Sequence, residues 1–289
     1  MRALVCPGQG SQKKGFLSPW LEIEGVREHL ERLSEAAGID LIHYGTEAEE
    51  ETIKDTAIAQ PLIVAAGIVT GRLALRELDG EELIFAGHSV GEITAAALAG
   101  VLSDEDAMRF VRVRANGMAE AAAASPTGMA AVLGGVEENV REAIDAAGLV
   151  AANSNGGGQI VAAGPIPAIE AFAANPPARA RVIPLKVAGA FHTEAMAPAV
   201  PALEEFAASL QVSDPTSALL TNRDGSAVAS GEEFVKTLVS QVTSPVRWDL
   251  CMATLLEREV DGIIEVAPAG TLVGLAKRAM RGVPGTSIN

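Results

Sequence analysis

The stretch from residue 83 to residue 100 constrains the fold of this chain more than any other part of the sequence. It begins with a short apolar run, 83–86, bounded by charge on one side and by Gly87 on the other. Such a run is expected for a buried parallel strand. After Gly87-His88-Ser89-Val90-Gly91, an alanine-rich helix is predicted from 91 to 100. A buried strand, a tight turn and a helix of small residues in this order indicate a layered α/β protein.

The turn between these elements matches the nucleophile elbow, G-x-S-x-G. In an elbow, the glycines flank a strained turn that lifts the serine hydroxyl clear of the sheet. The N-terminus of the following helix offers N–H groups to a developing oxyanion. Five-residue matches arise by chance, but the strand before and the helix after supply the expected context. Ser89 is therefore the candidate nucleophile.

A serine nucleophile needs a general base, and the chain has only four histidines. His29 and His43 lie in polar N-terminal segments, where surface positions are expected. His88 belongs to the elbow and would face away from its neighbour Ser89. His192 lies in an apolar loop between a predicted strand and a predicted helix. A hydrogen-bonded loop histidine is common in such a place, but by elimination His192 is the best partner for Ser89.

Arg114 falls on the apolar face of a predicted helix that starts after the N-cap Ser103 and runs to about residue 122. Apolar residues at helical spacing form that face: Ala107, Phe110, Val111, Ala115 and Met118. A buried arginine must be paired, because an isolated buried charge is very costly. Two interpretations stay open: a structural salt bridge, or a receptor that holds a substrate carboxylate through two hydrogen bonds.

A separate unit is predicted between residues 126 and 187. Strands are expected at 129–133, 149–152, 159–163 and 181–187, and helices at 137–147 and 166–174. This β-α-β-β-α-β order is ferredoxin-like. Outside this unit, strands are expected at 2–6 and 262–266, and helices at 22–37, 58–78, 195–210, 232–240, 245–259 and 271–281. Pro61 is placed in the first turn of its helix, where a missing N–H costs little.

Composition narrows the function classes. A net charge of −15 argues against nucleic-acid binding, which needs a basic face. The first residues indicate a strand and not a signal peptide, and the longest charge-free stretch, 146–169, is broken by glycines and two prolines. No membrane span is expected. Cys6 and Cys251 form no spacing pattern, which favours reduced thiols in a cytoplasmic protein. No metal site is predicted.

These residues together resemble the malonyl-CoA:acyl carrier protein transacylases. The likeness runs from Pro7-Gly8-Gln9-Gly10-Ser11-Gln12 almost to the C-terminus. Further matching positions, in order, are 87–92, Arg114 with Met118, 153–164, 189–192, and Gln241 with Ser244-Pro245-Val246. Several motifs in the right order are far more specific than the elbow alone.

The resemblance implies a role for each catalytic position. Ser89 would be acylated and His192 would be its general base. The main-chain N–H groups of Gln9 and Val90 would form the oxyanion hole. The main-chain carbonyl of Gln241 would orient His192 in place of a triad acid.

Two further positions would select the substrate. Arg114 would bind the malonyl carboxylate. Phe191 stands where methylmalonyl-specific relatives carry a smaller serine, which implies a malonyl pocket. Ala119 departs from the glutamine common in the family, and this weakens the support inferred for Arg114.

The implied fold is an α/β-hydrolase-like catalytic domain made of residues 1–125 and 188–289, with 126–187 inserted as a ferredoxin-like subdomain. The implied enzyme is an S-malonyltransferase that moves malonyl from malonyl-CoA to acyl carrier protein in a ping-pong cycle, for fatty-acid or polyketide synthesis. No cofactor, nucleic acid or membrane is expected to take part, and a cytoplasmic location is expected.

Two alternatives remain at this point. An esterase or thioesterase usually places its acid between the serine and a late histidine, whereas a long stretch follows His192 here. A non-catalytic binding module is disfavoured by the joint presence of Ser89, His192, Gln9 and Arg114.

Overall fold

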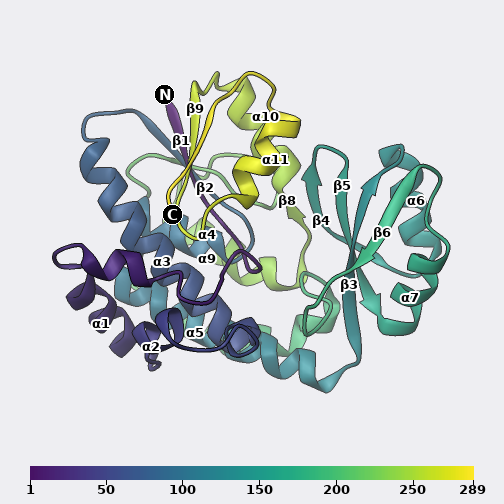
Figure 1. Cartoon of the computed structure of the whole chain (residues 1–289), viewed down its shortest axis with the longest axis horizontal. Helices are drawn as coiled ribbons and strands as arrows, with labels where there is room; N and C mark the ends of the chain where they lie inside the picture. The colour runs from purple at the N-terminus through teal and green to yellow at the C-terminus, as the bar shows by residue number, and fades with distance from the viewer.

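The computed structural model describes residues 1–289 and contains two sheets with helices around them (Figure 1). The first sheet has the strand order β10-β9-β1-β2-β7, and every pair in it is parallel. Its strands are β1 (Arg2–Cys6), β2 (Leu83–Gly87), β7 (Ala218–Leu219), β9 (Gly262–Glu265) and β10 (Gly285–Ser287). Because β1 and β2 are parallel neighbours, the loop after β1 and the elbow after β2 leave the same edge of the sheet.

Helices cover both faces of this sheet. Along β1, Leu4 and Cys6 point into the larger core, whereas Ala3 and Val5 point into a second core on the opposite face. The larger core is shared by α1 (Val26–Ala37), α2 (Leu41–Thr46), α3 (Thr56–Glu77), α4 (Gly91–Leu98), α5 (Asp104–Ala124), α8 (Val200–Ala207) and α9 (Gly231–Ser240). The second core is closed by α10 (Trp248–Glu257) and α11 (Thr271–Ala279).

Helix α3 begins earlier than expected, so Pro61 lies in its second turn and not in its first. The missing N–H of Pro61 leaves the carbonyl of Ala57 without its helical donor. Arg112 of α5 fills this gap, because its Nη1 donates to Ala57 O at 2.9 Å. Helix α3 therefore continues through the proline, tied to α5 at that turn.

By length and composition alone α3 could span a membrane, but 78% of its most apolar window is buried within the fold. Its side chains from Leu62 to Val69 belong to the larger core. Helix α3 is therefore the central helix of a protein core.

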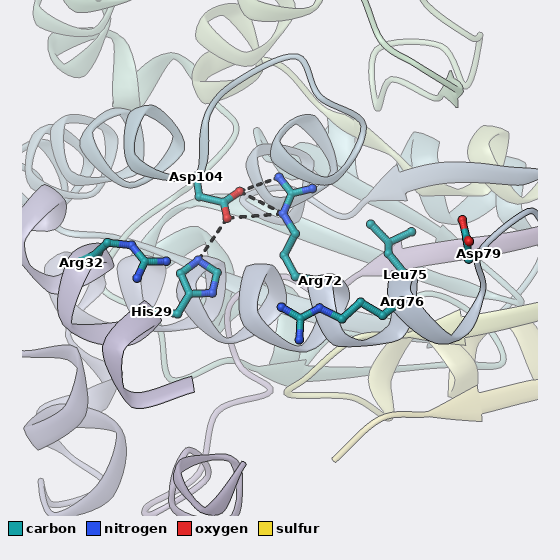
Figure 2. A pocket seen from close by; sticks show the side chains of 7 residues that line it. All are labelled: His29, Arg32, Arg72, Leu75, Arg76, Asp79 and Asp104. Atoms are coloured by element: carbon teal, nitrogen blue, oxygen red, sulfur yellow. Dashed lines mark hydrogen bonds and ion pairs between the residues drawn. The ribbon is translucent and has the colours of Figure 1, made fainter. Parts of the chain in front are cut away.

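A charged cluster joins three helices near the C-terminal end of α3 (Figure 2). Asp104 of α5 accepts hydrogen bonds from Arg72 of α3 at 2.6 Å, and its other oxygen lies 3.1 Å from His29 Nε2 of α1. His29 was predicted at the surface, but its side chain is only 16% exposed because α1 packs against α5. The hollow beside the cluster, about 610 Å³, contains no residue of the elbow or of the loop after β1.

The second sheet has the order β6-β3-β5-β4-β8. Its elements are β3 (Thr127–Gly134), α6 (Glu137–Ala146), β4 (Val150–Gly156), β5 (Gln159–Pro165), α7 (Ile166–Ala174) and β6 (Ala180–Pro184), joined by β8 (Val246–Arg247). The arrangement β6-β3-β5-β4 is the ferredoxin-like one, and α6 and α7 lie on the side away from the large domain (Figure 1). The predicted fold class, an α/β-hydrolase-like domain with a ferredoxin-like subdomain, is confirmed.

The subdomain differs from expectation in two respects. Residues 153–156, predicted as a loop, extend β4, and β8 of the large domain pairs with β4 through Asn153 and Val246. The second sheet therefore includes a strand from outside 126–187, and those bounds stay a prediction. Outside the subdomain, the helix predicted from 245 to 259 begins only at Trp248, because Val246 and Arg247 form β8. The elements α2, β7 and β10 were not predicted, because elements this short show almost no periodicity.

Candidate active site

The elbow holds Ser89 in a strained conformation. Its φ is +53°, in the left-handed region that a residue with a side chain seldom adopts. The flanking glycines are required, since a Cβ on Gly87 would collide with Glu92 N and one on Gly91 with the carbonyl of Cys6. The turn from β2 into α4 is thus too tight for other residues, and it presents the Ser89 hydroxyl to the cleft.

His192 lies beside this hydroxyl, with Nε2 2.7 Å from Ser89 Oγ. Its Nδ1 lies 2.9 Å from the main-chain carbonyl of Gln241. Because a carbonyl can only accept, Nδ1 carries the proton and Nε2 is the free acceptor. His192 is also left-handed, with φ +61°. Burial, and then the charge of Arg114, lower the pKa of His192 to about 3, so the imidazole is neutral.

Two main-chain N–H groups next to Ser89 have no acceptor within the protein. They belong to Gln9, in the loop after β1, and to Val90, the N-cap of α4. The N–H of Ser89 itself is occupied, because it donates to Asn222 Oδ1 at 2.8 Å. Both N–H groups of the predicted oxyanion hole are therefore unoccupied, and their role stays a prediction.

Arg114 is 1% exposed and contacts only neutral acceptors. Its Nη1 donates to Gln60 Oε1 at 2.6 Å and its Nη2 to Gln241 Oε1 at 2.8 Å. Burial lowers the pKa of Arg114 to about 10, which leaves it protonated at neutral pH. No carboxylate lies within ion-pair distance of its guanidinium. The structural salt bridge considered from the sequence is therefore absent.

A cleft of about 470 Å³ runs between the two sheets and contains the predicted residues Gln9, Ser89, Val90, Phe191 and His192. Phe191 is 7% exposed. The side chains of Gln60 and Met118 also line the cleft, whereas Arg114 and Gln241 do not. Arg114 therefore lies outside the lining of the cleft and contacts it through Gln60.

Three residues near the site were missed from the sequence. Asn222, 0% exposed, braces the elbow by accepting from Ser89 N and donating to Gly87 O at 2.7 Å. Asn155 of β4 lies 2.8 Å from His88 Nε2, which turns His88 away from Ser89. Glu92, in the first turn of α4, contacts Gln241. Only Glu92 left a signal, as an acidic residue within an otherwise apolar helix.

The position behind His192 Nδ1 separates two classes of serine enzyme. Serine hydrolases hold a carboxylate there, whereas this chain places the main-chain carbonyl of Gln241. Together with the ferredoxin-like subdomain beside the elbow, this defines an acyl transferase. Residues 3–288 match the family model described as the acyl transferase domain.

Comparison with similar proteins shows which acyl transferases this chain resembles. The chain is 52% identical over its whole length to the malonyl CoA-acyl carrier protein transacylase of Mycobacterium tuberculosis, covering 96% of that protein. It is 32% identical to the Escherichia coli protein of the same name, with 99% of this chain and 95% of that protein covered. This chain belongs to the malonyl-CoA:acyl carrier protein transacylase family.

Solved structures agree with this assignment. The crystal structure of the M. tuberculosis protein superimposes with a TM-score of 0.97 over 100% of this chain and 96% of the other, at 52% identity. A malonyl-transacylase solved in complex with a type II PKS acyl-carrier protein has a TM-score of 0.92, at 30% identity, over 100% of this chain and 96% of its own.

Proposed function

We propose that this chain transfers malonyl from coenzyme A to the phosphopantetheine thiol of acyl carrier protein through a malonyl ester of Ser89. The observation that carries the proposal is that one site contains both an elbow serine hydrogen-bonded to His192 and a buried cation, Arg114, whose partners are neutral. The names of the relatives point to the same donor and acceptor.

In the first half-reaction, His192 Nε2 takes the proton of Ser89 as Oγ attacks the thioester carbonyl. The N–H groups of Gln9 and Val90 bind the oxyanion of the tetrahedral intermediate. The intermediate collapses by breaking the C–S bond, and the leaving sulfur takes the proton from His192. Free coenzyme A and the malonyl-serine ester result.

The second half-reaction reverses these steps with a different thiol. The pantetheine sulfur gives its proton to His192 and attacks the ester carbonyl, and the same two N–H groups hold the oxyanion. Breaking the C–O bond returns the proton to Ser89 Oγ. The acyl group leaves on the carrier protein, and no cofactor is consumed.

Arg114 selects malonyl by binding its carboxylate. A carboxylate that displaces the Gln60 amide oxygen gains a charge-assisted pair with the guanidinium in place of a neutral hydrogen bond. Phe191 limits the space beside the malonyl α-carbon. An acetyl group has no carboxylate and therefore gains no interaction with Arg114.

We also propose a cytoplasmic location, supported by two buried free cysteines, Cys6 and Cys251. The carrier protein belongs to either fatty-acid or polyketide synthesis, since the two pathways use the same malonyl thioester.

The test is intact-protein mass spectrometry after mixing the protein separately with malonyl-CoA, acetyl-CoA and methylmalonyl-CoA. A single malonyl adduct is expected, mapped to Ser89 and discharged when holo acyl carrier protein is added. An adduct lost equally fast without the carrier would instead establish a thioesterase.

A further inference from the structure

Glu92 is a buried carboxylate to which the proposed transfer chemistry gives no step. It is 1% exposed, in the first turn of α4. Its Oε1 accepts from the main-chain N–H of Asn222 at 2.5 Å, and its Oε2 accepts from Gln241 Nε2. Glu92 therefore contacts the same glutamine that contacts both Arg114 and His192.

The donors and acceptors around Gln241 fix the orientation of its amide. Its Nε2 faces two acceptors, Glu92 Oε2 and the carbonyl of Ser89 at 3.0 Å. Its Oε1 faces Arg114, whose guanidinium has donors only. A reversed amide would set donor against donor at Arg114 and acceptor against acceptor at Glu92. Glu92 thus holds Gln241 in the orientation that satisfies Arg114.

Glu92 is also the charge that balances Arg114. A buried guanidinium requires a counter-charge nearby, and Glu92 is the carboxylate whose charge acts on it. The Gln241 amide lies between the Glu92 carboxylate and Arg114, so the guanidinium makes no ion pair with Glu92.

The other groups around Glu92 carry no charge. The thiol of Cys251 from α10 is neutral, because burial and the charge of Glu92 raise its pKa. His192 is neutral as well. Of the elements packed against α4, β1, β2, α3 and α9 bring no ionised side chain to Glu92, and α5 brings Arg114.

We propose that in mildly alkaline solution Glu92 is the counter-ion of Arg114 in the free enzyme, and that it takes a proton from solvent when the malonyl carboxylate binds. The inference rests on the proposed role of Arg114. Once the substrate is bound, two carboxylates share one guanidinium in a site closed to water. The repulsion between them is costly at low dielectric, and protonating Glu92 removes it.

The electrostatics of the free enzyme set the pH range of this role. Burial raises the pKa of Glu92 to about 8, against the opposing effect of its hydrogen bonds and of Arg114. The carboxyl is therefore mostly protonated at neutral pH and becomes the counter-ion above it. A second carboxylate at Arg114 raises that pKa further. At a pH between the pKa of Glu92 in the free enzyme and its pKa in the malonyl complex, the enzyme binds a proton together with malonyl.

The test is titration calorimetry of malonyl-CoA binding to Ser89→Ala, which cannot be acylated, in buffers that differ in ionisation enthalpy. Near pH 8.5 we expect net uptake of part of one proton. Acetyl-CoA, which lacks the carboxylate, is the matched ligand and should show none. Malonyl-CoA affinity should fall by up to about tenfold per pH unit above the pKa of Glu92, while acetyl-CoA affinity keeps a flat profile.

Adding Glu92→Gln to Ser89→Ala should abolish the proton uptake. Glu265→Gln is the matched control, because Glu265 is another buried carboxylate, 0% exposed, that binds the N-terminus of α11. The Glu265 variant should keep the uptake. Uptake that persists without Glu92, or that is absent from Ser89→Ala, overturns the inference.

Arg114→Ala in the Ser89→Ala background separates the two proposals. If this change leaves malonyl-CoA affinity as it was, the proposed role of Arg114 fails. If Arg114→Ala lowers the malonyl-CoA affinity but malonyl-CoA binding to Ser89→Ala takes up no proton, only the inference about Glu92 fails. Should Glu92→Gln not fold, the pH dependence in Ser89→Ala decides alone, and equal slopes for malonyl-CoA and acetyl-CoA contradict the inference.

Discussion

Gln241 accepts a hydrogen bond from Arg114 through its side chain, at 2.8 Å, and from His192 through its main-chain carbonyl, at 2.9 Å. One residue thus supports both the proposed anion receptor and the proposed base. The two functions use different atoms, and the side chain also donates to the main-chain carbonyl of Ser89 at 3.0 Å. Gln241 therefore links the proposed anion receptor, the proposed base and the elbow.

Replacing Arg114 by alanine should change which donor is used. Truncating one half of a buried charge pair costs about 2–5 kcal/mol, which is roughly 30-fold or more in kcat/KM for malonyl. Acetyl transfer needs no carboxylate partner and should be maintained or improved. The measurement is transfer to carrier protein from each donor, with folding checked by circular dichroism. Equal loss of both activities in a folded variant would show that Arg114 is structural.

Arg114→Lys should restore only part of the malonyl activity, because lysine keeps the charge but not the planar fork.

Removing the imidazole in His192→Ala should slow acylation of Ser89 by roughly 10³-fold or more. Burst kinetics with malonyl-CoA measure this step directly. A loss under about tenfold would place the base elsewhere.

The pH profile of acylation follows from the buried imidazole. Since the pKa of His192 is lowered to about 3, the base form is present throughout the neutral range. The acid limb of kcat/KM should then lie well below the ordinary histidine value of about 6.5. Arg114→Ala removes a charge that depresses this pKa, so the limb should move to higher pH when acetyl-CoA is the donor. An acid limb near 6.5 in the unmodified enzyme contradicts the assignment.

Phe191→Ser should widen the pocket beside the malonyl α-carbon. The kcat/KM ratio of methylmalonyl-CoA to malonyl-CoA should rise, by at most about 200-fold, because one methyl group is worth about 1–3 kcal/mol. An unchanged ratio would show that Phe191 does not limit the substrate.

Carrier docking on so acidic a chain requires a local basic surface. The last turn of α11 offers Lys277 and Arg278, and Arg281 follows just after the helix. Arg278 donates to Gln159, which lines the cleft, so this end lies beside the cleft. Reversing all three charges should raise KM for the carrier protein and leave acylation by malonyl-CoA unchanged. Reversal of Arg32 and Arg76, beside the separate hollow in Figure 2, is the matched control. A flat carrier KM would direct attention to Lys186 and to Arg179 and Arg181; it would also fit the simpler view that these charges only complement the helix dipole.

The parts of the fold and site predictable from sequence are those set by local rules. The elbow follows from two sterically required glycines, the Ser103 cap from its hydroxyl, and the subdomain order from regular periodicity. Asn222 could not be foreseen, because its contact with Ser89 joins residues far apart in the chain. The partners of Arg114 were likewise hidden. Burial predicts that a charge needs a partner, but only the fold shows that the partners are two neutral amides.

The neutral carbonyl behind His192 has a consequence for the charge of the whole site. Gln241 contacts both His192 and Arg114, so a triad acid in its place would stand next to the guanidinium. Such an acid would pair with Arg114 and repel the malonyl carboxylate. Because a dipole and not a charge orients the base, the cation stays available to an anionic substrate.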